Sequence, residues 1–124
     1  ADTSLPVAGP GGRGTAAACA ELCCLVVGVD ADQYLTAPTY AAVWLTSIMK
    51  NMDVAVYSTI VNVLNLGSVG NAYLGTLTNG GVGLAPYHDN EALVPAELTA
   101  AIAQLQADII AKGSLAAFLA PPEE

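Results

Sequence analysis

Charge is scarce in this sequence. Only 11% of the 124 residues are charged, against about a quarter in a typical soluble domain. Just three residues are basic, namely Arg13, Lys50 and Lys112, and with 11 acidic residues the formal net charge is −8. Nothing resembles the basic surface that contacts with phosphates require, so we expect no nucleic-acid partner.

Long hydrophobic runs are also missing, although 54% of the residues are hydrophobic and the mean hydropathy is +0.53. No stretch reaches the roughly 18 uninterrupted apolar residues of a membrane span. Residues 1–4 have neither the basic nor the apolar region of a signal peptide. At the length of one domain, such an apolar chain predicts a surface that a partner, or the rest of a longer polypeptide, covers.

Cysteine and histidine are few. Three cysteines, Cys19, Cys23 and Cys24, do not make a disulfide framework. Cys19 and Cys23 are one helical turn apart, but no third metal ligand lies near them in the sequence. We therefore interpret all three as small buried side chains and expect no metal or cofactor. The single histidine, His88, falls in a predicted loop and is interpreted as a solvated side chain.

What the sequence does contain is a buried strand followed by carboxylates. Residues 25–29 (LVVGV) form a short apolar run rich in β-branched side chains, which is typical of a strand buried on both faces. Asp30 and Asp32 follow at once. Open α/β sheets bind ligands just beyond the carboxyl ends of their strands, so Asp30 is a candidate ligand-binding residue. The alternative is that the two carboxylates cap the next turn, and for Asp32 we favour this structural role.

The neighbouring segments predict a βαβ unit. Residues 5–8 would end a first strand, a glycine-rich loop follows over 9–14, and 15–22 is an alanine-rich helical segment. A second buried strand is predicted over 42–49, with Lys50 at its end. Asp53 would cap a helix over 54–66 that ends at Gly67. This helix carries Val56, Ile60 and Val63 on one face.

The last third predicts a hairpin and a helix. Residues 72–78 and 82–86 flank Asn79-Gly80-Gly81, a sequence typical of a tight β-turn. A final helix would begin at Pro95 and end at Gly113. Its apolar stripe, which we expect to pack in the core, consists of Leu98, Ile102, Leu105 and Ile109. The sequence thus predicts a domain over 1–120 and a disordered tail over 121–124.

The glycine-rich loop also allows an alternative function. Gly9, Gly11 and Gly14 satisfy the pattern G-x-G-x-x-G, and Asp30 follows at about the spacing that a dinucleotide-binding site requires. The chain would then be a dinucleotide-binding fragment of an NAD-dependent oxidoreductase. Against this, no acid–base or nucleophile constellation is present, because His88 has no partner at a plausible spacing.

Several motifs together resemble the carboxyl-terminal part of the basic membrane lipoprotein family, the nucleoside-binding proteins of bacterial ABC importers. They are AGPGGRG at 8–14, VVGVDADQ at 26–33, LTSIMKNMDVAV at 45–56, GGVGLAPYHD at 80–89 and VPAE at 94–97. Their order along nearly the whole chain makes the resemblance specific.

This resemblance implies an α/β fold, part of a type I periplasmic-binding-protein (Rossmann-like) fold with parallel strands, crossover helices and the β-hairpin. It implies a non-enzymatic protein that binds a purine nucleoside and delivers it to an ABC permease. Gly9, Asp30 and Lys50 match the family's contacts to the ribose hydroxyls. The implied location is the periplasm or the outer face of the membrane, as a lipoprotein.

The chain departs from the family pattern in two ways. Pro10 and Gly11 stand where the family usually has glycine and threonine. The aromatic residues that enclose the base belong to the first two thirds of a family member, so this chain would hold half a site and bind nucleoside weakly by itself. A further possibility is an interaction domain whose exposed apolar surface mediates self-association.

Overall fold

The computed structural model describes residues 2–67, 72–113 and 119. These residues form a four-stranded sheet in the order β1-β2-β3-β4. The first three strands are parallel, and β4 pairs antiparallel with β3. The strands are β1 (Thr3–Ser4), β2 (Leu25–Asp30), β3 (Trp44–Lys50) and β4 (Val82–Leu84).

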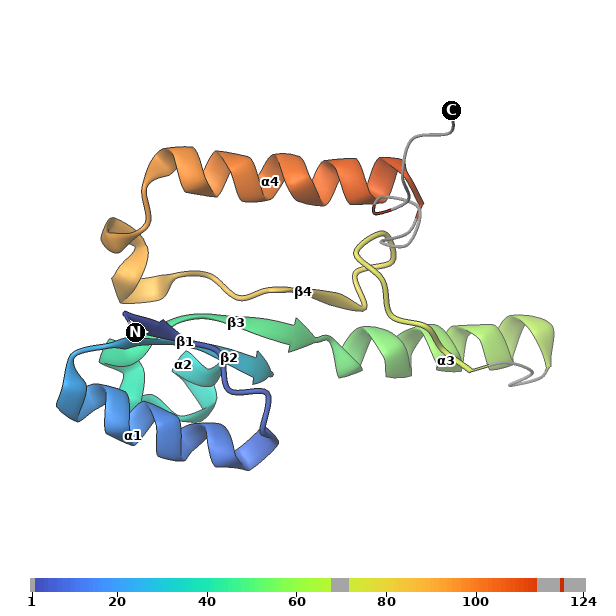
Figure 1. The fold of residues 1–124 in the computed structure, drawn as a ribbon. Coiled ribbons are helices and arrows are strands. Elements are labelled where there is room, and N and C mark those ends of the chain that lie inside the picture. The colour runs from blue at the N-terminus through green and yellow to red at the C-terminus, as the bar shows by residue number, and fades with distance from the viewer. Residues whose placement is uncertain (1, 68–71, 114–118, 120–124) are drawn as a thin grey trace.

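Helices α1 and α2 pack against the sheet, whereas α4 lies apart from it, beyond β4. Figure 1 shows α1 and α4 on opposite sides of the strands, with α3 extending beyond the end of β3. The α-helices are α1 (Gly12–Leu22), α2 (Gln33–Thr36), α3 (Met52–Leu66) and α4 (Ala96–Ala111), and the 3-10 segments are η1 (Gly9–Gly11), η2 (Pro38–Val43) and η3 (His88–Leu93). The predicted strand–helix–strand order of the first half is confirmed. The first strand, however, is Thr3–Ser4, and residues 5–8, where the sequence predicted its end, form no strand.

The core lies between α1, η2 and one face of the sheet. Its buried members are Ala16, Cys19, Val26, Ala37, Val43 and Trp44. On β2 only alternate residues, Val26 and Gly28, are buried, while the residues between them are half-buried. The prediction that this strand is buried on both faces is therefore wrong for the described part of the chain, which fully covers one face only.

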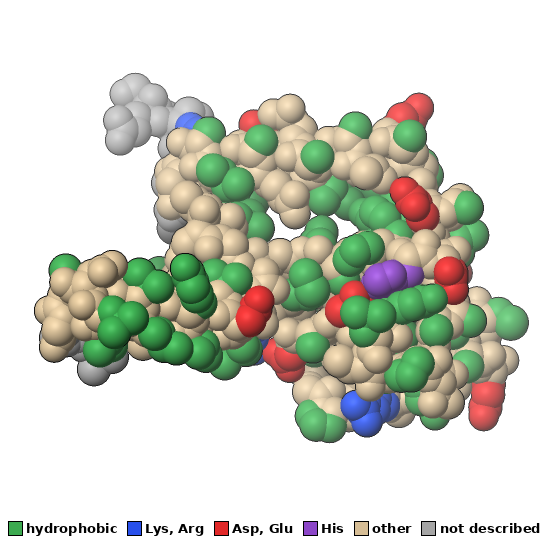
Figure 2. Space-filling view, turned by 180° about the vertical axis from the view of Figure 1, so that it is seen from behind, with side chains coloured by type: hydrophobic (Ala, Val, Ile, Leu, Met, Phe, Trp, Pro, Cys, Tyr) green, Lys and Arg blue, Asp and Glu red, His purple; other side chains and the backbone are tan. Residues whose placement is uncertain are grey.

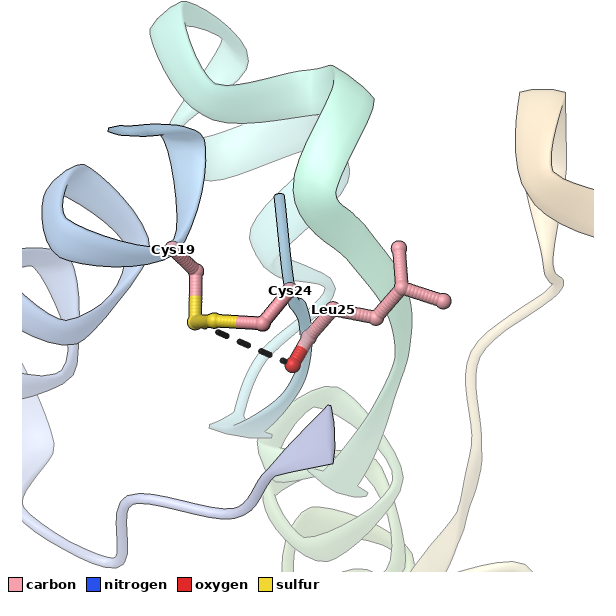
Figure 3. Close-up of a disulfide and its surroundings, with 3 residues drawn as sticks. All are labelled: Cys19, Cys24 and Leu25. Carbon is pink, nitrogen blue, oxygen red and sulfur yellow. Dashed lines mark hydrogen bonds between the residues drawn. A yellow bond between two sulfur atoms is a disulfide. The ribbon is translucent and has the colours of Figure 1, made fainter. Parts of the chain in front are cut away.

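A disulfide joins Cys19 to Cys24 (Figure 3), so the interpretation of all three cysteines as buried thiols is wrong. The helical spacing suggested Cys19 and Cys23 as neighbours, but α1 ends at Leu22. Cys23 adopts the left-handed conformation, with φ of 55°, and this turn brings the Cα of Cys24 to 4.7 Å from that of Cys19. Cys23 itself is an exposed free thiol.

Removing this disulfide should destabilise the fold. Closing so short a loop stabilises a protein by about 2 kcal/mol in the chain-entropy model. We therefore expect the Cys19→Ser/Cys24→Ser variant to lose about that free energy of unfolding, measured by urea denaturation. Cys23→Ser is the matched control, because Cys23 is exposed and unpaired. Equal denaturation midpoints for the two variants would contradict the prediction.

The predicted hairpin is wrong. Residues 72–78 form no strand, and β4 pairs instead with β3 through Ile48↔Leu84, Met49↔Gly83 and Lys50↔Val82. A side chain supplies hydrogen bonds to the backbone of the turn. Asn79 Oδ1 accepts one from the N–H of Thr76 at 2.8 Å and one from the N–H of Gly81 at 3.0 Å. The turn forms where predicted, but the strand that follows it, β4, pairs with β3 at the edge of the main sheet.

The apolar stripes of α3 and α4 are not core. Neither helix contains a buried residue, and Val56, Ile60 and Leu98 are each at least half exposed. Hydrophobic side chains lie along α3 and beside α4 on the face shown in Figure 2. The prediction that the stripe of α4 packs in the core is therefore wrong. Self-association through these surfaces stays a prediction.

Two helix ends differ in detail from the sequence prediction. Asn51, not Asp53, is the N-cap residue of α3, and Asp53 lies in the first helical turn, where a carboxylate interacts favourably with the helix dipole. Gly67 ends α3 in the left-handed conformation, as predicted. The tail predicted at 121–124 lies outside the described residues.

Candidate functional site

Two of the predicted site residues end neighbouring parallel strands. Asp30 is the last residue of β2 and Lys50 the last of β3. Because parallel strands end at the same edge of a sheet, the two side chains meet there, with Lys50 Nζ 2.7 Å from Asp30 Oδ1. The side chains are 69% and 48% exposed, respectively. Because both side chains are exposed, both charges are accessible to a ligand, and an ion pair so exposed contributes little to stability.

A surface pocket of about 200 Å³ lies next to this pair. It is lined by Gly9, Pro10, Arg13, Asp30 and Gln33. The structure thus brings Gly9 and Asp30 to one pocket and places Lys50 against Asp30. Gly9 has φ of +51°, a conformation that glycine adopts without steric cost.

The backbone at Asp30 is strained. Its φ is 73°, and the N–H of Ala31 donates a 3.0 Å hydrogen bond to the carbonyl oxygen of Val29. A hydrogen bond that spans one residue of positive φ defines the classic γ-turn, which is rare and strained. Strained residues of this kind cluster at functional sites. The turn stops β2 abruptly and leaves the Asp30 carboxylate at the pocket.

Gln33 is held in place behind the pocket. Its side-chain Nε2 donates to the Val29 carbonyl at 3.0 Å, and its backbone N–H donates to Ser47 Oγ at 3.1 Å. Gly28 makes this possible, since a Cβ there would lie 2.5 Å from both Gln33 Cγ and Ser47 Oγ. The pocket wall therefore depends on glycine at position 28.

A second polar cluster ties α2 to η3. His88 Nε2 lies 2.8 Å from Asp32 Oδ2, and the His88 ring stacks on that of Tyr34 with centroids 4.1 Å apart. Asp32 Oδ1 also accepts the N–H of Tyr34, as the N-cap of α2. The structural role predicted for Asp32 is confirmed. The interpretation of His88 as a merely solvated side chain is wrong.

Tyr34 completes this cluster. Its hydroxyl donates a 2.7 Å hydrogen bond to Asp89 Oδ2. That hydrogen bond, followed by partial desolvation and by the negative charge of Asp89, raises the pKa of Tyr34. The same hydrogen bond attaches η3, which carries His88 and Asp89, to α2.

Sequence reasoning missed Arg13 and Gln33 as pocket residues. Gln33 belongs to the GVDADQ motif, but only the tertiary structure shows that it lines the pocket as the first residue of α2. The sequence predicts Arg13 in the glycine-rich loop, whereas α1 begins at Gly12 and carries Arg13 in its first turn. The signal available in the sequence was the presence of one of only three basic residues beside this loop.

Among residues 2–67, 72–113 and 119 there is no cluster of three or more histidine, cysteine or acidic residues arranged to bind a metal. The helices in this part of the chain are too short or too polar to cross a membrane.

The fold and site define a class. A mostly parallel α/β sheet with a charged pair and a pocket at the carboxyl ends of its strands is consistent with part of a Rossmann-like periplasmic-binding-protein fold. Residues 1–117 match the family model Bmp, described as "ABC transporter substrate-binding protein PnrA-like". The chain belongs to this family, as the sequence motifs indicated.

A solved structure supports the fold. A transcriptional activator of the comK gene from Bacillus halodurans superposes with a TM-score of 0.71 at 21% sequence identity. The match covers 91% of this chain but only 38% of that one, so the chain spans well under half of its structural relative. A comparison with curated proteins gives no match. At this identity the likeness establishes the fold alone.

Proposed function

We propose that the chain is part of the solute-binding component of a bacterial ABC importer. The parent protein binds a purine nucleoside and delivers it to a permease. Membership of a substrate-binding family supports the general role. The single observation that carries the ligand assignment is the exposed pair of Asp30 and Lys50, with 2.7 Å between their charged atoms, beside the pocket.

The chemistry of this pair suits a ribose. An ionised carboxylate accepts hydrogen bonds from both hydroxyls of a vicinal diol, and an ammonium group donates to the same oxygen atoms. Because the two charges offset one another, a neutral sugar does not have to bury an unpaired charge. Gly9 contributes backbone groups that no side chain obstructs, which allows close approach of the sugar.

The pocket holds only part of such a ligand. Its volume of about 200 Å³ is below the roughly 300–1,000 Å³ of typical small-molecule sites. In the proposed complex the sugar lies against Asp30 and Lys50, and the base is enclosed by residues outside this chain. We therefore expect weak binding by the chain alone.

The proposed location is extracytoplasmic, in the periplasm or anchored to the outer face of the membrane. Substrate-binding proteins of importers act there, and the Cys19–Cys24 disulfide favours an oxidising compartment.

Binding can be tested by amide NMR titration with adenosine to about 10 mM, since a half-site is expected to bind in the millimolar range. The expected shifts centre on Gly9, Asp30 and Lys50. Asp30→Asn, which tolerates the positive φ, and Lys50→Met should each weaken binding about tenfold. Lys112→Met, at the end of α4, is the control and should bind as the wild type does.

Other outcomes would argue against this proposal. A dissociation constant below about 1 μM would contradict the half-site interpretation. A response to NAD with none to adenosine would favour the oxidoreductase alternative based on Gly9, Gly11, Gly14 and Asp30. Membership of a substrate-binding family already argues against that alternative.

A further inference from the structure

Arg13 places an uncompensated positive charge at the pocket. It lines the same pocket as Asp30, although the chain contains only three basic residues. Asp30 is paired with Lys50, so these two charges cancel. In the part of the chain that the structure describes, Arg13 has no salt-bridge partner, so the net charge of Arg13, Asp30 and Lys50 together is +1.

The guanidinium retains donors for a ligand. It carries five N–H groups, and among the described residues its one recorded hydrogen bond runs from Nη2 to the Thr36 carbonyl oxygen at 3.5 Å. This distance is long for an N–H···O hydrogen bond, and the contact is exposed. It neither uses up the donors nor fixes the side chain strongly.

The surroundings favour an anion at this end of the pocket. Arg13 lies in the first turn of α1, where the helix dipole adds partial positive charge. The net charge of −8 opposes anions at long range, but salt screens charges beyond about 8 Å at physiological ionic strength. The nearby guanidinium therefore determines the electrostatic interaction with an anion at this end of the pocket.

From these observations we infer that Arg13 binds a phosphate monoester carried by the ligand's sugar. The site then takes a sugar phosphate or a nucleoside monophosphate in preference to the neutral nucleoside. This inference rests on the proposed function, in which Asp30 and Lys50 hold the hydroxyls of the sugar. The added feature is one charge-assisted, two-pronged contact of the kind that arginine makes with phosphate.

The test compares three probes by amide NMR titration of the whole chain: adenosine, adenosine 5′-monophosphate and ribose 5-phosphate. We expect the monophosphate to bind about fivefold more tightly than adenosine, a modest gain because the site is exposed. Arg13→Gln should remove this preference, so that adenosine and its monophosphate bind the variant equally. Arg13→Lys should keep part of it, and Lys112→Gln, far from the pocket in sequence, should leave it unchanged.

The outcomes separate the inference from the proposed function. Equal binding of adenosine and its monophosphate by the wild type would overturn the role of Arg13 but leave the nucleoside proposal intact. Binding of ribose 5-phosphate with no response to adenosine would support Arg13 and overturn the nucleoside proposal. No response to any of the three probes would overturn both. A phosphate preference that survives Arg13→Gln would also overturn the inference.

Discussion

Replacing Trp44 with alanine should lower the free energy of unfolding by about 3–5 kcal/mol, the usual cost of truncating a buried aromatic residue. Trp44 is 2% exposed and belongs to the core between α1, η2 and the sheet. Its indole N–H also donates a 3.2 Å hydrogen bond to the Ala37 carbonyl. Because a domain of this size is stable by only about 5–15 kcal/mol, much of the fold's stability depends on this side chain.

Urea denaturation followed by circular dichroism measures this effect, since the substitution removes the chain's single tryptophan. Trp44→Phe is the matched control, because it keeps an aromatic ring but loses the indole hydrogen bond, and it should cost clearly less. If Trp44→Ala lowered the free energy of unfolding by less than about 1 kcal/mol, packing around Trp44 would not be a main source of stability.

Gly28→Ala should lower the free energy of unfolding by about 3 kcal/mol, at the upper end of the cost of overpacking. The added Cβ would lie 2.5 Å from Gln33 Cγ and from Ser47 Oγ, and Ser47 is fully buried. To relieve the clash Gln33 must move, and Gln33 lines the pocket. The substitution should therefore also weaken adenosine binding.

Gly83→Ala provides the control in the same sheet. The nearest atom to a Cβ at position 83 is Asn51 Nδ2 at 3.9 Å, an ordinary contact. We expect a change within about 0.5 kcal/mol for this variant, measured by the same denaturation. Similar losses for the two variants would mean that the general effect of alanine in a strand, rather than the packing at Gly28, determines the result.

Much of the site could be predicted from local sequence. The apolar run before Asp30 and the one before Lys50 each predict a strand, and in a parallel sheet their ends lie at one edge. That alone brings the two charges together. The position of Arg13 at the pocket and the contact between His88 and Asp32 could not be predicted in this way. Both depend on where contacts between distant segments place α1 and η3.

The sequence by itself determined the family and part of the secondary structure. The apolar runs predict the strands that end at Asp30 and Lys50, Gly67 predicts the end of α3, and the order of the motifs indicates the family. The tertiary structure decided which elements pair. It assigned β4 to β3, joined Cys19 to Cys24 and left the apolar stripes of α3 and α4 exposed. The physical reason is that local patterns fix backbone conformation within a few residues. Strand pairing and burial instead depend on contacts between distant residues, and the disulfide depends on the left-handed turn at Cys23, which the pattern of the sequence did not predict.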